Sequence, residues 1–283
     1  MKISVINTGY FKLDGGAMFG VVPKSIWEKL NPPDEKNLCT WAMRCLLIET
    51  NDKKILIDTG IGNKQNERFR SHFEPHGESN LKIVLSEKGV KLEDITDVFL
   101  THLHFDHCGG AVTQNTEGGL IPTFPNAIYW SNQTHFNWAM NPNEREAASF
   151  LKENFLTLYQ QGVLKFVKEE NDIEVFENIH IHFTFGHTES MMMLRIKHDE
   201  KTLIYCADTL PSQWHINMPY IMAYDIRPME SLKEKKWLLE NAVENGWYLF
   251  FEHDPTAECA TVKKDERNRI VLDKIYTINS QFD

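Results

Sequence analysis

One stretch of this chain carries most of its information: Thr101-His102-Leu103-His104-Phe105-Asp106-His107, directly after the apolar run Val98-Phe99-Leu100. It places three imidazoles and a carboxylate within six residues. Imidazole is a common ligand of zinc and iron, and a carboxylate among imidazoles favours a divalent-metal site that stays open to water. An apolar strand that empties into such a loop sets these groups at the rim of a sheet. The stretch therefore predicts a metal site.

Three later residues extend this set. His187 follows the alternating run Ile179–Phe183, Asp208 follows the strand-like run Thr202–Cys206, and His253 ends another apolar run. Each lies where an expected strand stops, so a layered sheet can bring all of them to one edge. Together they make five histidines and two aspartates, enough ligands for two metals a few ångströms apart. This is the ligand set of a hydrolytic site.

The motif His102-x-His104-x-Asp106-His107, followed in order by Gly-His, Asp and His, resembles the signature of the metallo-β-lactamase superfamily. The resemblance implies an α/β fold of the αββα sandwich type with two metals at one end. It implies that the first metal is bound by His102, His104 and His187, the second by Asp106, His107 and His253, and that Asp208 bridges both. It says little about substrate, because one fold hosts many chemistries.

The remaining pattern predicts two strand-rich halves, each with helices. Strands are expected near Lys2–Asn7, Met43–Glu49, Lys54–Ile57, Val98–Thr101, Ala127–Trp130, His180–Phe183, Met191–Ile196, Leu203–Cys206 and Tyr248–Phe251. Helices stopped by a glycine are expected at Leu81–Lys88, Asn143–Gln161 and Met229–Asn245. Asp58-Thr59-Gly60 matches a loop of the superfamily that supports the ligands from behind. We interpret His180 and His182 as ordinary strand residues, and the following as surface or loop residues: His72, His76, His135 and His198.

Composition indicates a soluble enzyme. The 30 basic and 40 acidic residues give a net charge of −10 without any basic block, which argues against a nucleic-acid partner. No stretch reaches the ~20 apolar residues of a membrane span, and the start lacks a signal-peptide pattern, so we expect no membrane partner and a cytoplasmic location. The five cysteines form no CxxC pair and are expected to be thiols in a reducing compartment: Cys39, Cys45, Cys108, Cys206 and Cys259.

We expect one metallo-β-lactamase-fold domain over residues 1–283, with the glycine-hinged, apolar segment 10–34 as a lid. The stretches Asp14–Lys24 and Met222–Met229 resemble the quorum-quenching N-acyl homoserine lactonases and the related methyl parathion hydrolases. A homodimer is suggested by this resemblance alone. Candidates to line an apolar pocket, for which core packing is an equal explanation, are Met18, Phe19, Phe105, Trp138, Met140 and Trp214.

Taken together, the motif and the resemblance predict a dinuclear-metal hydrolase that opens lactones such as N-acyl homoserine lactones with a metal-bound hydroxide. The substrate is expected to be a small, neutral molecule with an apolar tail. Two divalent ions are expected, zinc first, with manganese, iron and cobalt as alternatives. Asp106 and Asp208 are the candidate catalytic residues, because one can orient the hydroxide and the other fixes the metal separation. A phosphotriesterase of the methyl parathion hydrolase type and an iron-dependent redox enzyme stay open as alternatives.

The sequence departs from the resemblance at one position. Some lactonases of this kind carry a tyrosine three residues after the bridging aspartate, where it contacts the substrate carbonyl. Here that residue is Pro211. We name His215, Tyr220 and Tyr224 as candidates to take over the contact, and the sequence does not choose among them.

Overall fold

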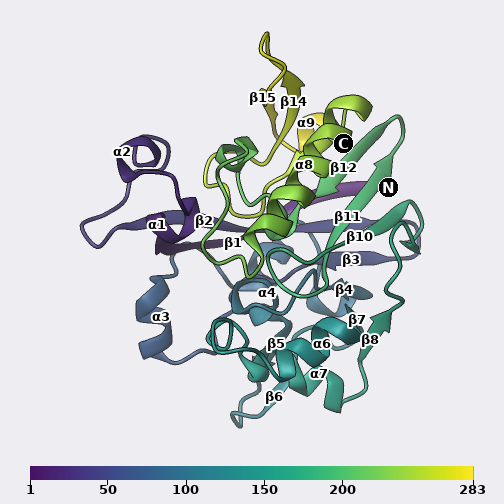
Figure 1. The fold of residues 1–283 in the computed structure, drawn as a ribbon. Helices are drawn as coiled ribbons and strands as arrows, with labels where there is room; N and C mark the ends of the chain where they lie inside the picture. Colours follow the sequence, from purple (N-terminus) through teal and green to yellow (C-terminus); the bar gives the residue numbers. More distant parts are fainter. Residues whose placement is uncertain (283) are drawn as a thin grey trace. The chain divides into compact units, whose positions relative to one another are not determined.

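The computed structural model describes residues 1–282, which divide into two compact units (Figure 1). Unit 1 consists of Met1–Phe11 and Ala42–Glu169, and unit 2 consists of Lys12–Trp41 and the chain from Glu170 onward. Within residues 1–282, no helix has the length and apolar character needed to cross a membrane.

Unit 1 is built on a six-stranded sheet with the strand order β1-β2-β3-β4-β7-β8. Its strands are β1 (Lys2–Asp14), β2 (Leu38–Glu49), β3 (Lys54–Ile57), β4 (Asp97–Phe99), β7 (Ile128–Asn132) and β8 (Leu164–Val167), and the first two run on into unit 2 residues. A separate hairpin joins β5 (Val112–Gln114) and β6 (Leu120–Pro122). The helices are α3 (Glu67–Phe73), α4 (Leu81–Ser86), η1 (Leu92–Asp94), α5 (Phe105–Cys108), η2 (Gly109–Ala111), α6 (Gln133–Met140), η3 (Lys152–Asn154) and α7 (Leu156–Gln160).

The strands β3, β4, β7 and β8 are parallel neighbours. The residues Leu56, Val98 and Tyr129 of these strands are fully buried and share one core with residues of α4, α6 and α7. Because the carboxyl ends of parallel strands meet at one edge of a sheet, the loop after β3 and the loop after β4 lie together. The first of these loops carries Asp58, and the second carries the histidine-rich stretch.

Unit 2 is built on a seven-stranded sheet with the order β15-β14-β13-β12-β11-β10-β9, in which β12 and β13 are the parallel pair. Its strands are β9 (Glu174–Phe176), β10 (Ile179–Thr184), β11 (Met191–His198), β12 (Lys201–Tyr205), β13 (Tyr248–Phe250), β14 (Cys259–Lys264) and β15 (Ile270–Tyr276). The helices are α1 (Gly15–Phe19), α2 (Lys24–Trp27), η4 (Ala207–Thr209), η5 (Gln213–Ile216), α8 (Pro228–Asn245) and α9 (Asn279–Phe282).

The helix α8 packs on one face of this sheet (Figure 1). It starts with Pro228 at its first turn and ends at Gly246, whose left-handed backbone (φ 64°) closes the helix. Its buried side chains recur at helical spacing: Ser231, Lys235, Leu238, Leu239 and Ala242. Four of these five are small or apolar, as a buried stripe requires, and Lys235 is the exception.

The expected strands and the helix at Met229–Asn245 are confirmed, whereas the expected helix Asn143–Gln161 is wrong. That stretch forms turns, η3 and α7 instead. The Ser149 carbonyl accepts the backbone N–H of Phe105, and the Glu146 carboxylate accepts the indole N–H of Trp138. These bonds to other segments draw backbone and side chains away from a continuous helix.

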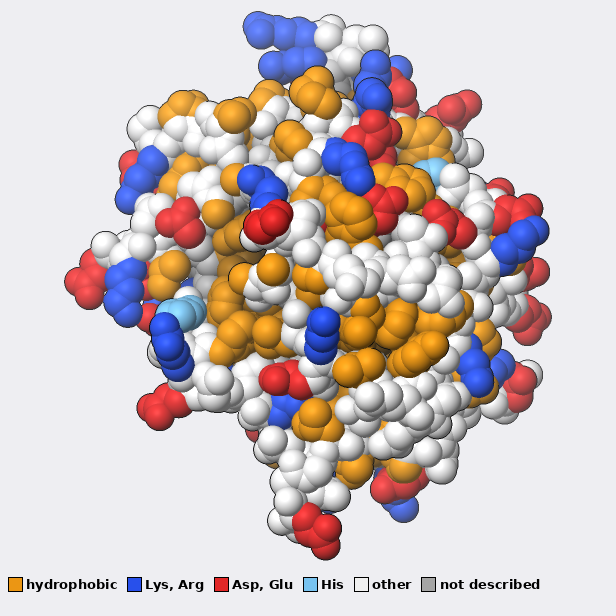
Figure 2. Space-filling model, turned by 60° about the horizontal axis from the view of Figure 1, so that its bottom comes forward, with side chains coloured by type: hydrophobic (Ala, Val, Ile, Leu, Met, Phe, Trp, Pro, Cys, Tyr) orange, Lys and Arg blue, Asp and Glu red, His pale blue; other side chains and the backbone are white. Residues whose placement is uncertain are grey.

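Charged side chains of both signs are interspersed on the face of the molecule in Figure 2, with hydrophobic side chains between them. The five cysteines form no disulfide in the described part of the chain, and all are buried, as expected for thiols. Burial raises the pKa of Cys108 to about 12, so this thiol beside the metal motif is protonated and unreactive at neutral pH.

Candidate metal centre

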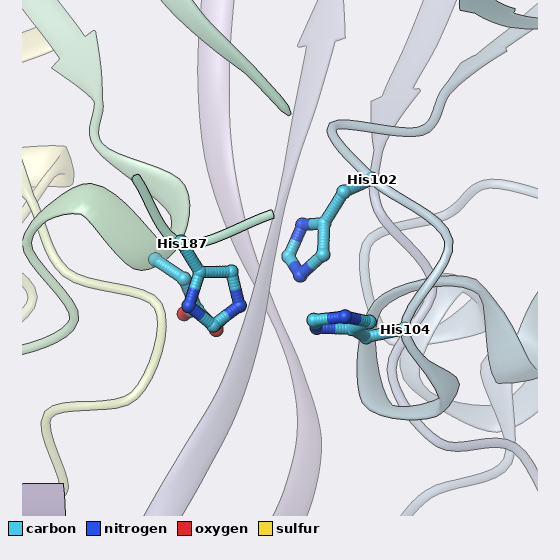
Figure 3. A group of neighbouring side chains, drawn as sticks. His102, His104 and His187 are labelled. Atoms are coloured by element: carbon cyan, nitrogen blue, oxygen red, sulfur yellow. The ribbon is translucent and has the colours of Figure 1, made fainter. Parts of the chain in front are cut away.

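The unit 1 cluster consists of His102, His104, Asp106 and His107, all on the loop and short helix that follow β4. His102 and His107 are fully buried, and the other two are less than a tenth exposed. The ring of His102 lies 3.9 Å from that of His107 and 4.6 Å from that of His104, centroid to centroid. Figure 3 shows the His102 and His104 rings next to each other. The sequence-predicted ligands of this unit therefore meet.

The buried carboxylate of Asp58 organises this cluster. It accepts the backbone N–H of Thr101 at 2.8 Å and the Thr101 hydroxyl at 2.7 Å. Since the single hydroxyl proton of Thr101 goes to Asp58, the 3.1 Å contact between the Thr101 hydroxyl and His102 Nδ1 requires that nitrogen to donate. Asp58 also lies 3.2 Å from His107 Nδ1. Both rings thus carry their proton on Nδ1, which leaves Nε2 as the atom that can bind a metal.

Backbone contacts fix the same loop from two further sides. The backbone N–H and the hydroxyl of Thr59 both donate to the His107 carbonyl, at 2.7 and 2.9 Å. On the other side, the Leu103 N–H donates to Nε2 of His135 at 2.8 Å. His135 is fully buried, so the expectation that it is a surface or loop residue is wrong. It supports the motif from α6, where its ring accepts a hydrogen bond from the Leu103 N–H.

The unit 2 cluster consists of His187, Asp208 and His253, each of which follows a strand of the seven-stranded sheet. One carboxylate oxygen of Asp208 lies 3.1 Å from His187 Nε2, and the other lies 3.1 Å from His253 Nε2. All three side chains are nearly or fully buried. Figure 3 includes the ring of His187. Asp208 therefore offers one oxygen on each of two sides, as a carboxylate that bridges two cations does.

A second carboxylate sets the orientation of His187. Asp225 Oδ1 accepts Nδ1–H of His187 at 2.9 Å, which again leaves Nε2 for a metal. Burial alone lowers the pKa of His187, but the carboxylates of Asp208 and Asp225 outweigh it and raise the pKa to about 10. The position thus favours a positive charge strongly. A bound cation satisfies the same preference.

The loop that carries His187 is held by the chain around the start of α8. The Glu234 carboxylate accepts the N–H groups of Phe185 and Gly186 at 2.6 and 3.1 Å. Arg227 donates to the Phe185 carbonyl at 2.7 Å and pairs with Glu189 at 2.6 Å. The packing is so close at Gly186 that an added Cβ would lie 2.3 Å from the Ser231 backbone nitrogen. The His187 ring is therefore placed by a rigid loop.

The donor set of both clusters fits divalent metals of the zinc type. Imidazole nitrogens and carboxylate oxygens are the ligands that zinc, manganese, iron and cobalt accept. Buried imidazoles in contact cannot all be protonated, and neutral imidazole is the form that binds metal. Each histidine whose second nitrogen is engaged by Asp58, Thr101 or Asp225 has the outer partner that metal-binding histidines require.

The apolar residues proposed to line a pocket divide into two kinds. Phe19 is fully buried, stacked between Trp27 and His215 at centroid distances of 5.4 Å on each side. Phe105 packs against Phe73 and is 6% exposed. These two residues and Met18, which is 1% exposed, are core positions of their units. Other candidates of the set keep partly exposed surface: Trp138, Met140 and Trp214.

Asp225, Glu234, Arg227 and His135 were not identified from the sequence as parts of the site. Only Asp58 was expected to support the ligands. A local pattern points to Asp225 and Arg227, because both lie in the stretch Met222–Met229 that was singled out by resemblance. Nothing local marks His135 or Glu234, which act through bonds to residues 32 and 49 positions away.

Replacing Asp225 by asparagine tests its role in orienting His187. Asp225→Asn keeps the size of the side chain but removes the charge that fixes the His187 tautomer. We expect the affinity for Zn²⁺ to fall by about 10- to 100-fold, the usual cost of losing such a partner. Competition titration with a chromophoric chelator measures it. The control Asp199→Asn changes an exposed aspartate and should bind Zn²⁺ like the parent. Equal affinities of both variants would remove Asp225 from the site.

The comparisons with known proteins agree with this geometry. The family model described as the metallo-beta-lactamase superfamily matches residues 44–253. An N-acyl homoserine lactonase of Bacillus cereus is 26% identical over 243 residues, which cover 81% of this chain and 87% of the relative. A solved structure described as a probable metal-dependent hydrolase from Staphylococcus aureus aligns with a TM-score of 0.85 at 29% identity, over 97% of this chain and 98% of that one.

A further solved structure, AidC, is described as a dizinc quorum-quenching lactonase in complex with a product. It aligns with a TM-score of 0.78 over 97% of this chain and 94% of its own, at 20% identity, which shows a likeness of fold. The family match covers well over half of the chain, and the predicted α/β fold class, with the metallo-β-lactamase fold, is confirmed. The chain belongs to the metallo-beta-lactamase superfamily and is a metal-dependent hydrolase.

Proposed function

We propose that the unit 1 and unit 2 clusters together hold two divalent metal ions, most simply zinc. In this proposal the first ion is bound by His102, His104 and His187, the second by Asp106, His107 and His253, and Asp208 is shared. The arrangement around Asp208 is the observation that carries it, because each of its two oxygens lies 3.1 Å from a different imidazole. A shared carboxylate needs this two-sided placement.

We further propose that the substrates are N-acyl homoserine lactones or similar neutral lactones with an apolar tail. The similarity to a Bacillus cereus lactonase over 81% of this chain supports this substrate class. Two divalent metals, once bound, lower the pKa of a water molecule to near neutrality and polarise the carbonyl to be attacked. No serine or cysteine nucleophile is then needed, in keeping with the buried, protonated thiol of Cys108.

The protein groups have distinct tasks in this reaction. Asp106, 7% exposed and beside His107, can accept a hydrogen bond from the attacking water and aim it. Asp208 would bind both ions, one through each oxygen. Asp58 and Asp225 hold the ligand rings so that they do not reorient as charge develops on the substrate. We also propose that the segment 10–34 acts as a lid over this site.

The contact to the substrate carbonyl narrows to two tyrosines. His215 is excluded, because its Nδ1 accepts the Ser212 hydroxyl at 2.7 Å and its Nε2–H donates to the Met18 carbonyl at 2.9 Å. Burial lowers the pKa of His215 to about 3, so it stays neutral and fully engaged. Tyr220 and Tyr224 both keep exposed surface and remain the candidates to replace the tyrosine that Pro211 displaces.

A pH-stat assay tests the lactonase proposal. Zinc-loaded protein should release acid from short- and long-chain N-acyl homoserine lactones, and His104→Ala should lower the rate by about 100-fold or more, since losing even an outer partner costs up to that much. His72→Ala, a change at a surface histidine of α3, should leave the rate unchanged. Absence of acid release from protein shown to hold two metals rejects the lactonase proposal and brings phosphotriesters to the front.

Metal analysis of Asp208→Ala tests the shared ligand. Removing a carboxylate that serves both ions should leave less than the full two equivalents of metal and lower turnover along with it. Elemental analysis after gel filtration, combined with the lactone assay, gives both numbers. Asp199→Ala, at an exposed position of the same unit, is the matched control. An Asp208→Ala protein that keeps two metals and full activity would contradict the assignment.

A further inference from the structure

Lys235 stands out because it occupies an apolar position of α8. It belongs to the stripe Ser231, Lys235, Leu238, Leu239 and Ala242 that the helix buries, and it is 1% exposed. A buried ammonium group is costly unless hydrogen bonds replace its lost hydration. Its Nζ donates to the carbonyl of Asn217 at 3.0 Å and to the carbonyl of Tyr220 at 2.8 Å. Neither the fold nor the proposed reaction requires a lysine at this position.

The two carbonyls belong to one segment, Pro211–Ala223, which we call the wall segment. It begins three residues after Asp208, and its Pro211 carbonyl accepts the N–H of His253 at 3.1 Å. Its far end is tied by the Ala223 N–H, which donates to the Ala17 carbonyl at 2.7 Å. Both ends are therefore fixed beside other parts of unit 2, and Lys235 binds the middle from the side of α8.

The wall segment carries aromatic side chains that keep exposed surface. Tyr220 and Trp214 are partly exposed, and both contact the buried ring of Phe19, edge-on at 6.0 Å and tilted at 6.1 Å. Trp214 also meets Trp41 edge-on at 5.8 Å. The start of the segment adjoins unit 2's half of the proposed site, because its Pro211 carbonyl binds the His253 N–H. These rings offer apolar surface for a long acyl chain.

We propose that Lys235 is a positioning residue that sets the acyl-chain specificity of the enzyme by fixing the wall segment, and with it the Tyr220 ring. Lys235 binds the Tyr220 backbone carbonyl, and Phe19 contacts the Tyr220 ring. This inference rests on the proposed lactonase function. It concerns the binding of the tail, not the chemical step.

The charge of Lys235 makes the proposed role depend on pH. Burial lowers the pKa of Lys235 to about 7, and the Asp225 carboxylate offsets part of this effect. His215, on the wall segment itself, also faces the ammonium group but stays neutral, because burial lowers its own pKa to about 3. The neighbouring helix positions carry Glu234, bonded to the His187 loop, and Lys236, which is exposed. As pH rises through about 7, the charge-assisted bonds to the wall segment weaken.

The first test compares Lys235→Met with Lys236→Met, a matched change at the next, exposed position of α8. We expect Lys235→Met to raise KM for N-decanoyl homoserine lactone by about tenfold. A loss of this size corresponds to about half of the apolar contact that one buried side chain makes, here contact between the acyl chain and the wall segment. The kcat of Lys235→Met, its metal content and its KM for N-butanoyl homoserine lactone should stay at wild-type values, and Lys236→Met should change nothing. Equal rises of KM for both chains, or lost metal, would show a merely structural lysine and overturn the proposal.

Hydrogen–deuterium exchange tests the same proposal without any activity. Peptides from residues 211–223 should exchange faster in Lys235→Met than in Lys236→Met or wild type, while the rest of unit 2 is unchanged. Wild-type exchange in these peptides contradicts the proposal. If the wild-type protein opens no lactone, the proposed function fails, and exchange alone still decides whether Lys235 holds the wall segment. If Lys235→Met does not fold, Lys235→Gln, which keeps an amide donor but removes the charge, should show the decanoyl effect in its place.

The pH profile separates this role from the chemistry of the metals. Any titration at the metals affects long and short chains alike, so the ratio of the decanoyl KM to the butanoyl KM isolates the wall segment. In the wild type this ratio should rise between about pH 6 and about pH 8, because Lys235 loses its proton there, whereas in Lys235→Met it should be flat. A flat ratio in the wild type overturns the proposal.

Discussion

The carboxylate of Asp58 is the constraint on which the unit 1 cluster depends. It is fully buried, and its backbone takes the left-handed conformation (φ 58°), which side-chain-bearing residues rarely adopt. In return it binds the backbone and the hydroxyl of Thr101 and faces Nδ1 of His107. One anion thus fixes the loop, the ring orientations and, through Thr101, the tautomer of His102. Without it, His102 and His107 would have no common reason to present Nε2.

Unit 2 uses the same device with different residues. Asp225 engages Nδ1 of His187, and Asp208 then meets the other nitrogen of that ring and, with its second oxygen, His253. The two carboxylates act together, because both raise the pKa of His187 and make its buried position strongly favourable for positive charge. This negative environment suits a cation of higher charge than a proton.

The sequence predicted the residues of the two clusters better than the structure around them. The candidate ligands follow strand ends at characteristic spacings, so a local pattern marks them, and the strands themselves are short apolar runs. The expected helix Asn143–Gln161 failed because the Ser149 carbonyl binds Phe105, far away in the chain. His135 was assigned to the surface for the same reason, since its partner Leu103 lies 32 residues earlier. Contacts of this kind have no signature in a single sequence.

Helix α8 makes two such long-range contacts through adjacent residues. Two adjacent residues of opposite charge serve two separate segments: Glu234 accepts backbone N–H groups of the His187 loop, and Lys235 donates to backbone carbonyls of the wall segment. Each charge is matched to the backbone groups that it meets, a carboxylate to donors and an ammonium group to acceptors. Because both originate from one helix, any shift of α8 moves the candidate ligand His187 and the proposed tail-binding surface together. In the proposed enzyme, substrate preference and metal geometry are then coupled through backbone hydrogen bonds, which changes of other side chains leave intact.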